Sequence, residues 1–206
     1  MKIEFTHSAA PLESPASHAG IVSLRTASVA DEAFLCDVFV STRWDEFART
    51  GWEPSRIDAF LRHQSQLQHT YYREHYPHAF FDVVLAGAEP VGRLYHAWRP
   101  AQLGDEVRII DIALLPAWRG KGIGTRLLRA LIAGAVREGL PVTLNVEADN
   151  PVQSLYWRLG FVKQSSEQDG GVYGLMRREC APLDIQLDAQ AVSSVTSRDD
   201  ARTVCA

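Results

Sequence analysis

The sequence contains the stretch Ile109-Ile110-Asp111-Ile112-Ala113-Leu114-Leu115-Pro116-Ala117-Trp118-Arg119-Gly120-Lys121-Gly122-Ile123-Gly124-Thr125. Its first half is apolar and β-branched, which is typical of a buried strand, and Pro116 stops that strand. Its second half is a glycine-rich turn that opens a long amphipathic helix, predicted from Gly120 to Glu138 with Gly139 as its stop. This order places the unpaired N–H groups of the first helical turn beside the end of the strand.

The glycine-rich turn has the chemistry of an anion site. The first N–H groups of a helix have no internal partner, and the helix dipole adds partial positive charge there. The glycines let an anion approach this backbone closely, and Arg119 and Lys121 add positive charge at the same point. The turn therefore predicts a phosphate or pyrophosphate site; the alternative is that the glycines serve only a tight turn.

Two better-known phosphate loops are absent from this turn. No Gly-Lys pair is followed by Ser or Thr, so the Walker pattern is missing. The dinucleotide fingerprint also fails, because Gly120, Gly122 and Gly124 are spaced by two and Leu127 stands where a third glycine is needed. These spacings argue against a nucleotide-phosphate binder of either kind.

Two motifs resemble the GNAT superfamily of acyl-CoA-dependent N-acetyltransferases. Arg119-x-x-Gly122-x-Gly124 is similar to that family's R-x-x-G-x-G/A signature. Downstream, a second block resembles its N-x-x-A-x-x-L-Y-x-x-x-G-F motif and reads Asn150-Pro151-Val152-Gln153-Ser154-Leu155-Tyr156-Trp157-Arg158-Leu159-Gly160-Phe161. Gln153 stands where Ala is usual, and we expect this departure to matter little on a helix surface.

The rest of the core has the element order that this resemblance implies. Apolar alternation predicts strands at 21–25, 80–86, 91–98, 107–115, 141–147, 161–164 and 172–176. Capping residues and periodicity predict further helices at 28–40, 54–76 and 151–159. We expect an α/β (α+β) fold with a mixed, mostly antiparallel central sheet and helices on both faces. Residues 21–180 would form one domain between a flexible N-terminal tail, 1–20, and a loose C-terminal tail, 181–206.

The resemblance implies acetyl-CoA as a co-substrate. In the family the pyrophosphate lies on the amides of the turn, here Arg119, Gly120, Lys121, Gly122, Ile123, Gly124 and Thr125. The pantetheine arm pairs like an added strand with the preceding strand, here Ile112, Ala113 and Leu114. The N–H of Leu114 is the expected donor to the thioester carbonyl, where it would stabilise charge that develops in the transition state. Asn150 is expected to contact the pantetheine or the amine.

Tyr156 matches the family's usual general acid, which protonates the leaving thiolate. A phenol has an unperturbed pKa of about 10, close enough to that of a thiol to share a proton with it. The alternative is an aromatic packing residue, since Leu155 and Trp157 flank it.

The base that deprotonates the acceptor amine stays open. Asp111 and Glu147 are candidates, and a water relay through backbone groups is the alternative. Asp111 lies in an apolar strand, where strict alternation places it opposite to Ile110, Ile112 and Leu114. If these even positions face the acetyl group, the role of Asp111 is structural.

Acceptor specificity is expected from the segment before the glycine-rich turn. Gln64, Gln68 and Tyr72 are spaced by four, so they share one face of the predicted helix. With Trp44 and Glu46, this polar and aromatic face could line an amine pocket. The alternative is a solvated face with a partly buried tyrosine.

Composition and charge argue against several other classes. The 21 Lys and Arg and 25 Asp and Glu give a net charge of −4, which disfavours a general nucleic-acid binder. Cys36, Cys180 and Cys205 form no disulfide framework, and the histidines lack ligand spacing, so no metal is expected. No stretch reaches the roughly 18 consecutive apolar residues of a membrane span, which predicts no membrane association and a cytoplasmic protein.

The function expected from these observations is N-acetyl transfer from acetyl-CoA. The acceptor would be a primary amine of a small molecule or a peptide, attacked directly in a ternary complex because no Cys or Ser in either motif asks for a covalent intermediate. A non-catalytic acyl-CoA-binding sensor or scaffold module is the alternative, disfavoured by the presence of Tyr156 and Asn150. Many members of the family pair, so the resemblance leaves a homodimer open.

Overall fold

The computed structural model describes residues 21–164 and 173–180. The two expected tails, 1–20 and 181–206, and the expected turn at Asp169-Gly170-Gly171 lie outside these residues. Within them, the elements follow in the predicted order of strands and helices.

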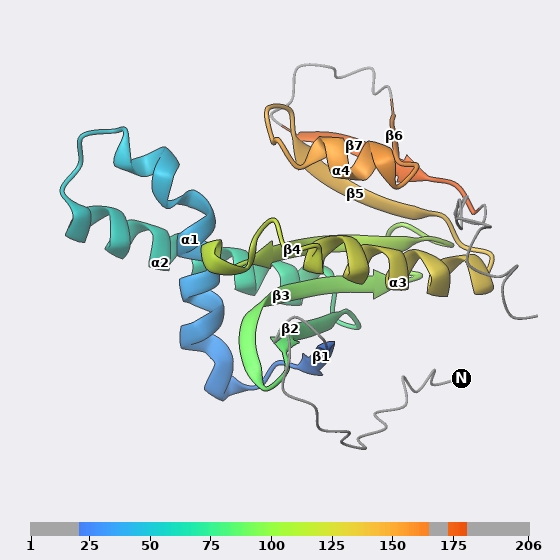
Figure 1. Ribbon diagram of the computed structural model, residues 1–206, viewed down its shortest axis with the longest axis horizontal. Coiled ribbons are helices and arrows are strands. Elements are labelled where there is room, and N and C mark those ends of the chain that lie inside the picture. Colours follow the sequence, from blue (N-terminus) through green and yellow to red (C-terminus); the bar gives the residue numbers. More distant parts are fainter. Residues whose placement is uncertain (1–20, 165–172, 181–206) are drawn as a thin grey trace, which may run out of the picture.

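A seven-stranded sheet forms the centre of the molecule, with its strands in the order β1-β2-β3-β4-β5-β7-β6 (Figure 1). Its strands are β1 (Val22–Thr26), β2 (Phe80–Ala86), β3 (Glu89–Trp98), β4 (Val107–Leu114), β5 (Val142–Glu147), β6 (Val162–Lys163) and β7 (Tyr173–Arg178). Only the β4–β5 pair is parallel among these neighbours, which confirms the mixed, mostly antiparallel sheet. A parallel pair needs a crossover, and the helix that follows β4 provides it.

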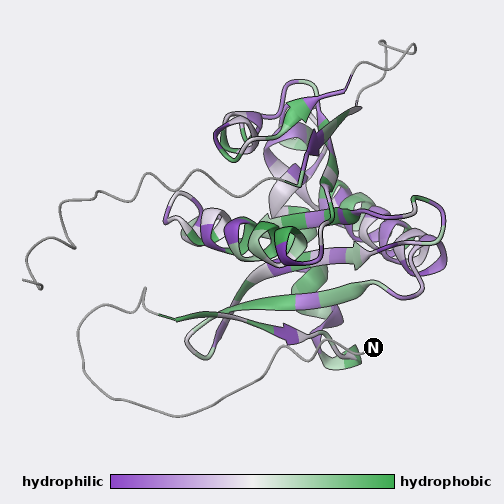
Figure 2. Ribbon diagram, turned by 90° about the vertical axis from the view of Figure 1, so that its right-hand side faces the viewer, coloured by the Kyte–Doolittle hydropathy of each residue, from purple (hydrophilic) through white to green (hydrophobic). Residues whose placement is uncertain are grey.

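Helices cover both faces of this sheet, as predicted. They are α1 (Glu32–Ala48), α2 (Pro54–His75), α3 (Ile123–Arg137) and α4 (Gln153–Arg158). Helices α1 and α2 lie on one face of the sheet and α3 on the other (Figure 1). In Figure 2 the central strands are mostly hydrophobic, whereas the helices alternate between hydrophobic and hydrophilic residues. This alternation is expected where one side of a helix is buried and the other is solvated.

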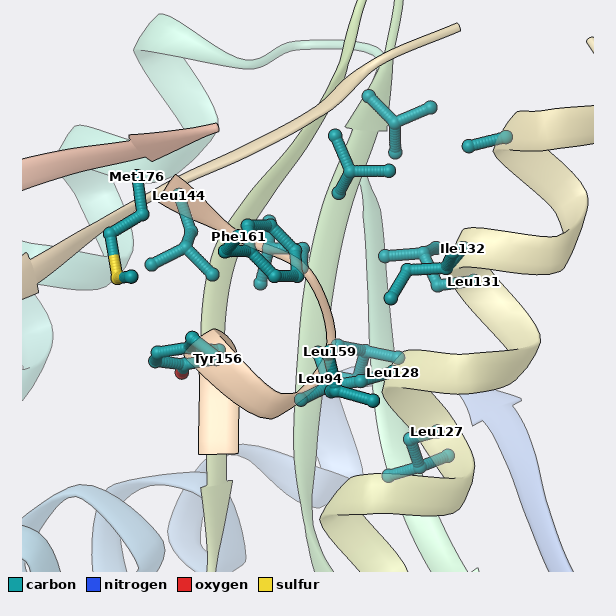
Figure 3. Close-up of a cluster of buried hydrophobic side chains, with 14 of the residues drawn as sticks. Leu94, Leu127, Leu128, Leu131, Ile132, Leu144, Tyr156, Leu159, Phe161 and Met176 are labelled. Carbon is teal, nitrogen blue, oxygen red and sulfur yellow. The ribbon is translucent and has the colours of Figure 1, made fainter. Parts of the chain in front are cut away.

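The largest core cluster lies between α3 and the sheet (Figure 3). Helix α3 buries the stripe that the sequence predicts, including Leu127, Leu128, Leu131 and Ile132. Tyr156 of α4 joins the same cluster, so α4 packs on the α3 side of the sheet. A second cluster, which contains Phe81 and Tyr95, packs under α1 and α2.

Three predicted helix boundaries are wrong, and one of them is the start of α4, predicted at Pro151 and observed at Gln153. The helix predicted from Gly120 begins at Ile123, because Gly122 has a φ of 78° and takes the left-handed conformation at the N-cap. The helix predicted to end at Val40 continues to Ala48. Its start is nevertheless the predicted one, since Ser28 and Asp31 form a capping box at the short 3-10 turn before it.

Candidate active site

Among the described residues, strand β4 has no strand partner on its β5 side beyond its first three residues. It pairs with β5 only from Val107 to Ile109, and beyond these residues the two strands diverge (Figure 1). On the other edge, the N–H of Leu115 donates to the carbonyl oxygen of Val91 on the β3 side at 2.9 Å. Backbone groups in a strand alternate in direction, so Ile112 and Leu114 turn their N–H and C=O groups toward the gap. These are the groups that an added strand-like ligand would need.

The glycine-rich turn follows this edge after a short 3-10 turn, Pro116–Trp118. Gly120 and Gly122 have φ values of 72° and 78°, a conformation that favours glycine. No side chain caps α3, and its first helical bond runs from the N–H of Arg126 to the carbonyl oxygen of Gly122 at 3.0 Å. The N–H groups of residues 123–125 therefore precede the hydrogen-bonded helix and remain available to an anion.

Gly124 is a glycine that neither the packing nor the backbone conformation of the turn requires. A Cβ added there would meet nothing within 4 Å, and its φ lies outside the positive range that favours glycine. Neither packing nor backbone strain within the chain requires glycine at this position. Glycine also weakens a helix, so its presence here needs another reason. Space beside the N–H groups of the first turn is the property that this glycine provides, and an approaching phosphate would use it.

The basic side chains of the turn, Arg119 and Lys121, contact other groups of the chain. The Nε of Arg119 donates to the carbonyl oxygen of Leu114 at 2.8 Å, and its Nη2 donates to the carbonyl oxygen of Ser41 at 3.1 Å. The Nζ of Lys121 lies 4.9 Å from the centroid of the Trp118 ring. Arg119 thus ties the turn to β4 and α1.

Tyr156 is buried in the core cluster beside α3. It is 6% exposed and packs edge-to-face on Phe161 at 5.8 Å between ring centroids, close to Leu144 and Met176 (Figure 3). Burial, and then the negative charge of Asp111, raise the pKa of Tyr156 to about 12. The phenol therefore stays protonated at neutral pH, as a proton donor must.

The junction between β5 and α4 contains Asn150 and Gln153. The Oδ1 of Asn150 accepts from the N–H of Val152 at 2.9 Å, so this side chain caps the turn. The amide of Gln153 donates to the carbonyl oxygens of Glu147 and Ala148 at 2.8 and 2.6 Å. The expectation that glutamine matters little here is wrong, because it ties α4 to the end of β5.

Asp111 forms an ion pair with the buried Arg93, which also donates to the Oε1 of Gln68 at 3.0 Å. Tyr95 pairs with Asp111 and His96 with Ile109, so the register shifts at Ile110. This β-bulge breaks the strict alternation assumed from the sequence.

The bulge changes which neighbours share a face with Asp111. Ile110 packs in the cluster that contains Tyr95, while Ile112 and Leu114 pack toward α3. Asp111 therefore lies on the same face as Ile110, under α1 and α2, and opposite to Ile112 and Leu114.

Glu147 ends β5 beside the gap and belongs to a polar network. Its Oε1 accepts from the Nη1 of Arg43 at 2.6 Å and from the hydroxyl of Tyr173 at 3.0 Å. The Nε of Arg43 also pairs with the Oε2 of Glu46 at 3.0 Å. Burial and the hydrogen bond to Glu147 raise the pKa of Tyr173, so its phenol is a neutral donor. This network joins α1, β5 and β7 on the side of α1 and α2.

A cavity of about 490 Å³ lies on the same side. The described residues that line it are Phe39, Arg43, Phe47, Phe60, Leu61, Gln64, Leu67, Gln68, Tyr71 and Tyr173. Gln64 and Gln68 are thus brought together as predicted. Trp44 and Tyr72 are not part of this lining: Trp44 packs against the core between α1 and α2, and Tyr72 packs edge-to-face on Tyr95.

Sequence reasoning missed most of this cavity. Arg43 and Tyr173 lie far apart in the sequence, and the fold brings both of them to Glu147 as hydrogen-bond donors. The aromatic residues between α1 and α2 were a usable signal, since Phe47, Trp52 and Phe60 form a cluster with ring centroids 5.1 to 6.2 Å apart.

Two wider features of the described residues bear on the class of protein. None of the described helices has the length and apolar character to cross a bilayer. Among residues 21–164 and 173–180, no three His, Cys, Asp or Glu side chains gather in a way that could hold a metal ion.

Comparison with known proteins agrees with this geometry. The sequence profile of the Acetyltransferase (GNAT) family matches residues 36–161. A search of curated proteins finds no match.

Solved structures share the fold. The PaiA N-acetyltransferase of Thermoplasma acidophilum, crystallised with coenzyme A, is 18% identical with a TM-score of 0.54, covering 78% of this chain and 99% of its own. An acetyltransferase of Thermus thermophilus is 21% identical with a TM-score of 0.56, covering 79% and 99%. A Corynebacterium glutamicum protein described as histone acetyltransferase HPA2 and related acetyltransferase is 24% identical with a TM-score of 0.54, covering 78% and 98%. The family profile spans more than half of the chain, and the chain therefore belongs to the GNAT family of acetyltransferases.

Proposed function

We propose that this acetyltransferase moves acetyl from acetyl-CoA to a primary amine of a small molecule or peptide, by direct attack in a ternary complex. The observation that carries the proposal is the edge of β4 at Ile112 and Leu114, which is followed, after the short 3-10 turn Pro116–Trp118, by the turn at Gly120 and Gly122. An extended amide-bearing arm and a diphosphate, joined as in coenzyme A, match these two features in order.

The backbone would hold the coenzyme, whose thioester supplies an activated acetyl group. The N–H groups of residues 123–125 face the diphosphate, and the open groups of Ile112 and Leu114 pair with the pantetheine arm. The carbonyl oxygen of Leu114 already accepts from Arg119, which leaves its N–H as the donor on this edge. A fixed N–H at this point stabilises negative charge that develops on the acetyl oxygen.

Tyr156 is assigned as the general acid. Its raised pKa, about 12, keeps the proton on the phenol until the thiolate leaves. The hydrophobic cluster around the ring excludes water and fixes the side chain, so the packing role and the acid role support each other.

Glu147 is assigned as the group that takes the amine proton, directly or through a water. It lies at the end of β5 beside the gap, and its Oε1 is held by Arg43 and Tyr173. Asp111 is assigned a positioning role, because the buried Arg93 holds its carboxylate. The two described thiols stand apart from this centre: Cys36 accepts from Arg62, and Cys180 lies against the carbonyl oxygen of Val136. Direct attack of the amine on the acetyl carbon needs neither thiol.

The decisive experiment is calorimetric titration with coenzyme A, followed by thiol release from acetyl-CoA in the presence of a panel of primary amines. Binding together with amine-dependent thiol release supports the proposal. Absence of binding would overturn the coenzyme site. Binding without release for any amine would leave the alternative of an acyl-CoA sensor.

A further inference from the structure

The cavity between α1 and α2 shares two lining residues with the hydrogen-bond network around Glu147. Arg43 and Tyr173 line the cavity, and both donate to Glu147 at the end of β5. An acceptor in the cavity therefore lies next to the group assigned to take its proton. The body of the acceptor must then match the walls of this cavity.

The charges at the cavity favour one cationic group on the acceptor. Arg43 is the one charged side chain among the described lining residues. It pairs with two carboxylates, Glu147 at 2.6 Å and Glu46 at 3.0 Å, so this cluster has excess negative charge. Glu147 and Glu46 do not line the cavity themselves, but both pair with Arg43, which is therefore a poor partner for a carboxylate or phosphate on the acceptor. The net negative charge of the three groups favours an ammonium group instead.

The remaining walls are mainly apolar. They comprise Phe39, Phe47, Phe60, Leu61 and Leu67, with the rings of Tyr71 and Tyr173. The rings of Phe47 and Phe60 contact each other at 5.1 Å between centroids. A volume of about 490 Å³ lies within the range that binds a small molecule. None of the described lining residues is a carboxylate, so a second ammonium group would gain no ion-pair partner from these walls.

Gln68 presents a fixed polar group to this apolar space. An arginine can only donate hydrogen bonds, so the contact of 3.0 Å from Arg93 must use the oxygen of the Gln68 amide. Arg93 is 5% exposed and held by Asp111, which fixes Gln68 from behind. The NH₂ group of Gln68 is thereby turned away from Arg93 as a donor. Gln64 stands one turn earlier on the same cavity wall.

We infer that the acceptor is a hydrophobic primary monoamine, an alkyl or aryl body that carries one ammonium group and no anionic group. This inference rests on the proposed function and narrows it. It selects small apolar amines over peptides, amino acids and polyamines.

Matched amines test this inference on the full-length protein. Phenylethylamine differs from ethylamine by its aryl body and from phenylalanine by the absence of a carboxylate. Hexylamine differs from hexamethylenediamine by the absence of a second ammonium group. We expect kcat/KM for phenylethylamine to exceed that for ethylamine by about a hundredfold and that for phenylalanine by about tenfold or more. Phenylalaninamide separates bulk from charge, because its neutral amide should restore most of the loss seen with phenylalanine.

A charge placed in the cavity should change this preference. Gln64→Glu should raise kcat/KM for hexamethylenediamine relative to hexylamine by about fivefold. Gln66→Glu is the matched control, since Gln66 is exposed on the same helix and does not line the cavity. Equal effects of the two variants would overturn the assignment of this cavity.

A direct measurement of amine binding distinguishes failure of this inference from failure of the proposed function. Calorimetry of each amine against the protein saturated with coenzyme A measures binding without turnover. If coenzyme A binds but phenylethylamine binds no better than phenylalanine or ethylamine, the inference fails while the coenzyme site stands. If coenzyme A itself does not bind, the proposed function fails first.

Discussion

The proposed coenzyme site and the proposed acceptor site differ in the part of the chain that forms them: backbone groups form the first, and side chains form the second. On the proposed coenzyme side, the edge of β4 and the turn at Gly120 and Gly122 offer backbone groups. On the proposed acceptor side, the cavity is walled by side chains from α1, α2 and β7. A backbone site depends on conformation and on the absence of side chains, whereas a cavity depends on the identity of every wall residue. The first should therefore respond to changes at glycines, and the second to changes of side-chain charge and size.

Gly122→Asp should give the largest loss on the coenzyme side. Aspartate tolerates the left-handed conformation better than most residues, so its charge beside the diphosphate is the main effect. We expect coenzyme A affinity, measured by calorimetry, to fall by more than about a hundredfold. Gly104→Asp is the control, because Gly104 has the same φ of 78° and also meets nothing within 4 Å. Equal losses from both variants would refute a backbone site at the turn.

Asp111→Asn tests the buried ion pair with Arg93, which holds Gln68 of the cavity wall. Arg93, 5% exposed, would keep a buried charge without its partner. The free energy of unfolding in urea should fall by about 3 kcal/mol. Replacing the pair together, Arg93→Met with Asp111→Leu, should recover most of this stability. If the double variant is stable but has lost the pH dependence of kcat, Asp111 is the base after all.

Tyr156→Phe tests a side chain that serves the coenzyme side. Loss of the general acid should lower kcat by about a hundredfold, while coenzyme A affinity stays within about twofold. Because the pKa of Tyr156 is about 12, the phenol remains protonated through the neutral range and the deficit should be constant from pH 6 to about 9. Tyr76→Phe, on the end of α2, is the control. An unchanged kcat would reduce Tyr156 to a packing residue.

Gly124→Ala should give the smallest effects: the free energy of unfolding should rise slightly, whereas the affinity for coenzyme A should fall. Alanine is the better helix former and meets no neighbour, so the free energy of unfolding of the free protein should rise by up to about 1 kcal/mol. Coenzyme A should bind more weakly, because the methyl group occupies space beside the first-turn N–H groups. A gain in stability without a loss in affinity would show that this glycine serves no ligand.

The same contrast explains how much the sequence could predict. The glycine-rich turn, the β4 strand before it and the stripe of α3 are continuous in sequence, so periodicity and motif locate them together. The fold followed from the same local patterns. The start of α3 was misplaced because glycine spacing does not show which glycine adopts positive φ.

The acceptor side could not be predicted in the same way. Arg43, Gln68 and Tyr173 meet through tertiary packing, and no local pattern links them. The side on which Asp111 lies depends on a bulge at Ile110, and one extra residue in a strand reverses every alternation argument beyond it. Gln64 and Gln68 were found because they share a helix face, but Tyr72 one turn later already lies against the core.

The open edge of β4 also has a consequence for the stability of the protein. An unpaired strand edge is the part of a sheet most exposed to wrong association, and a ligand that completes the edge removes that hazard. Any ligand bound only by the folded state adds stability in proportion to the logarithm of its concentration, about 2.7 kcal/mol at a hundred times its Kd. The proposed binding of acyl-CoA at this edge would therefore make the stability of the protein, as well as its rate, depend on the acyl-CoA concentration.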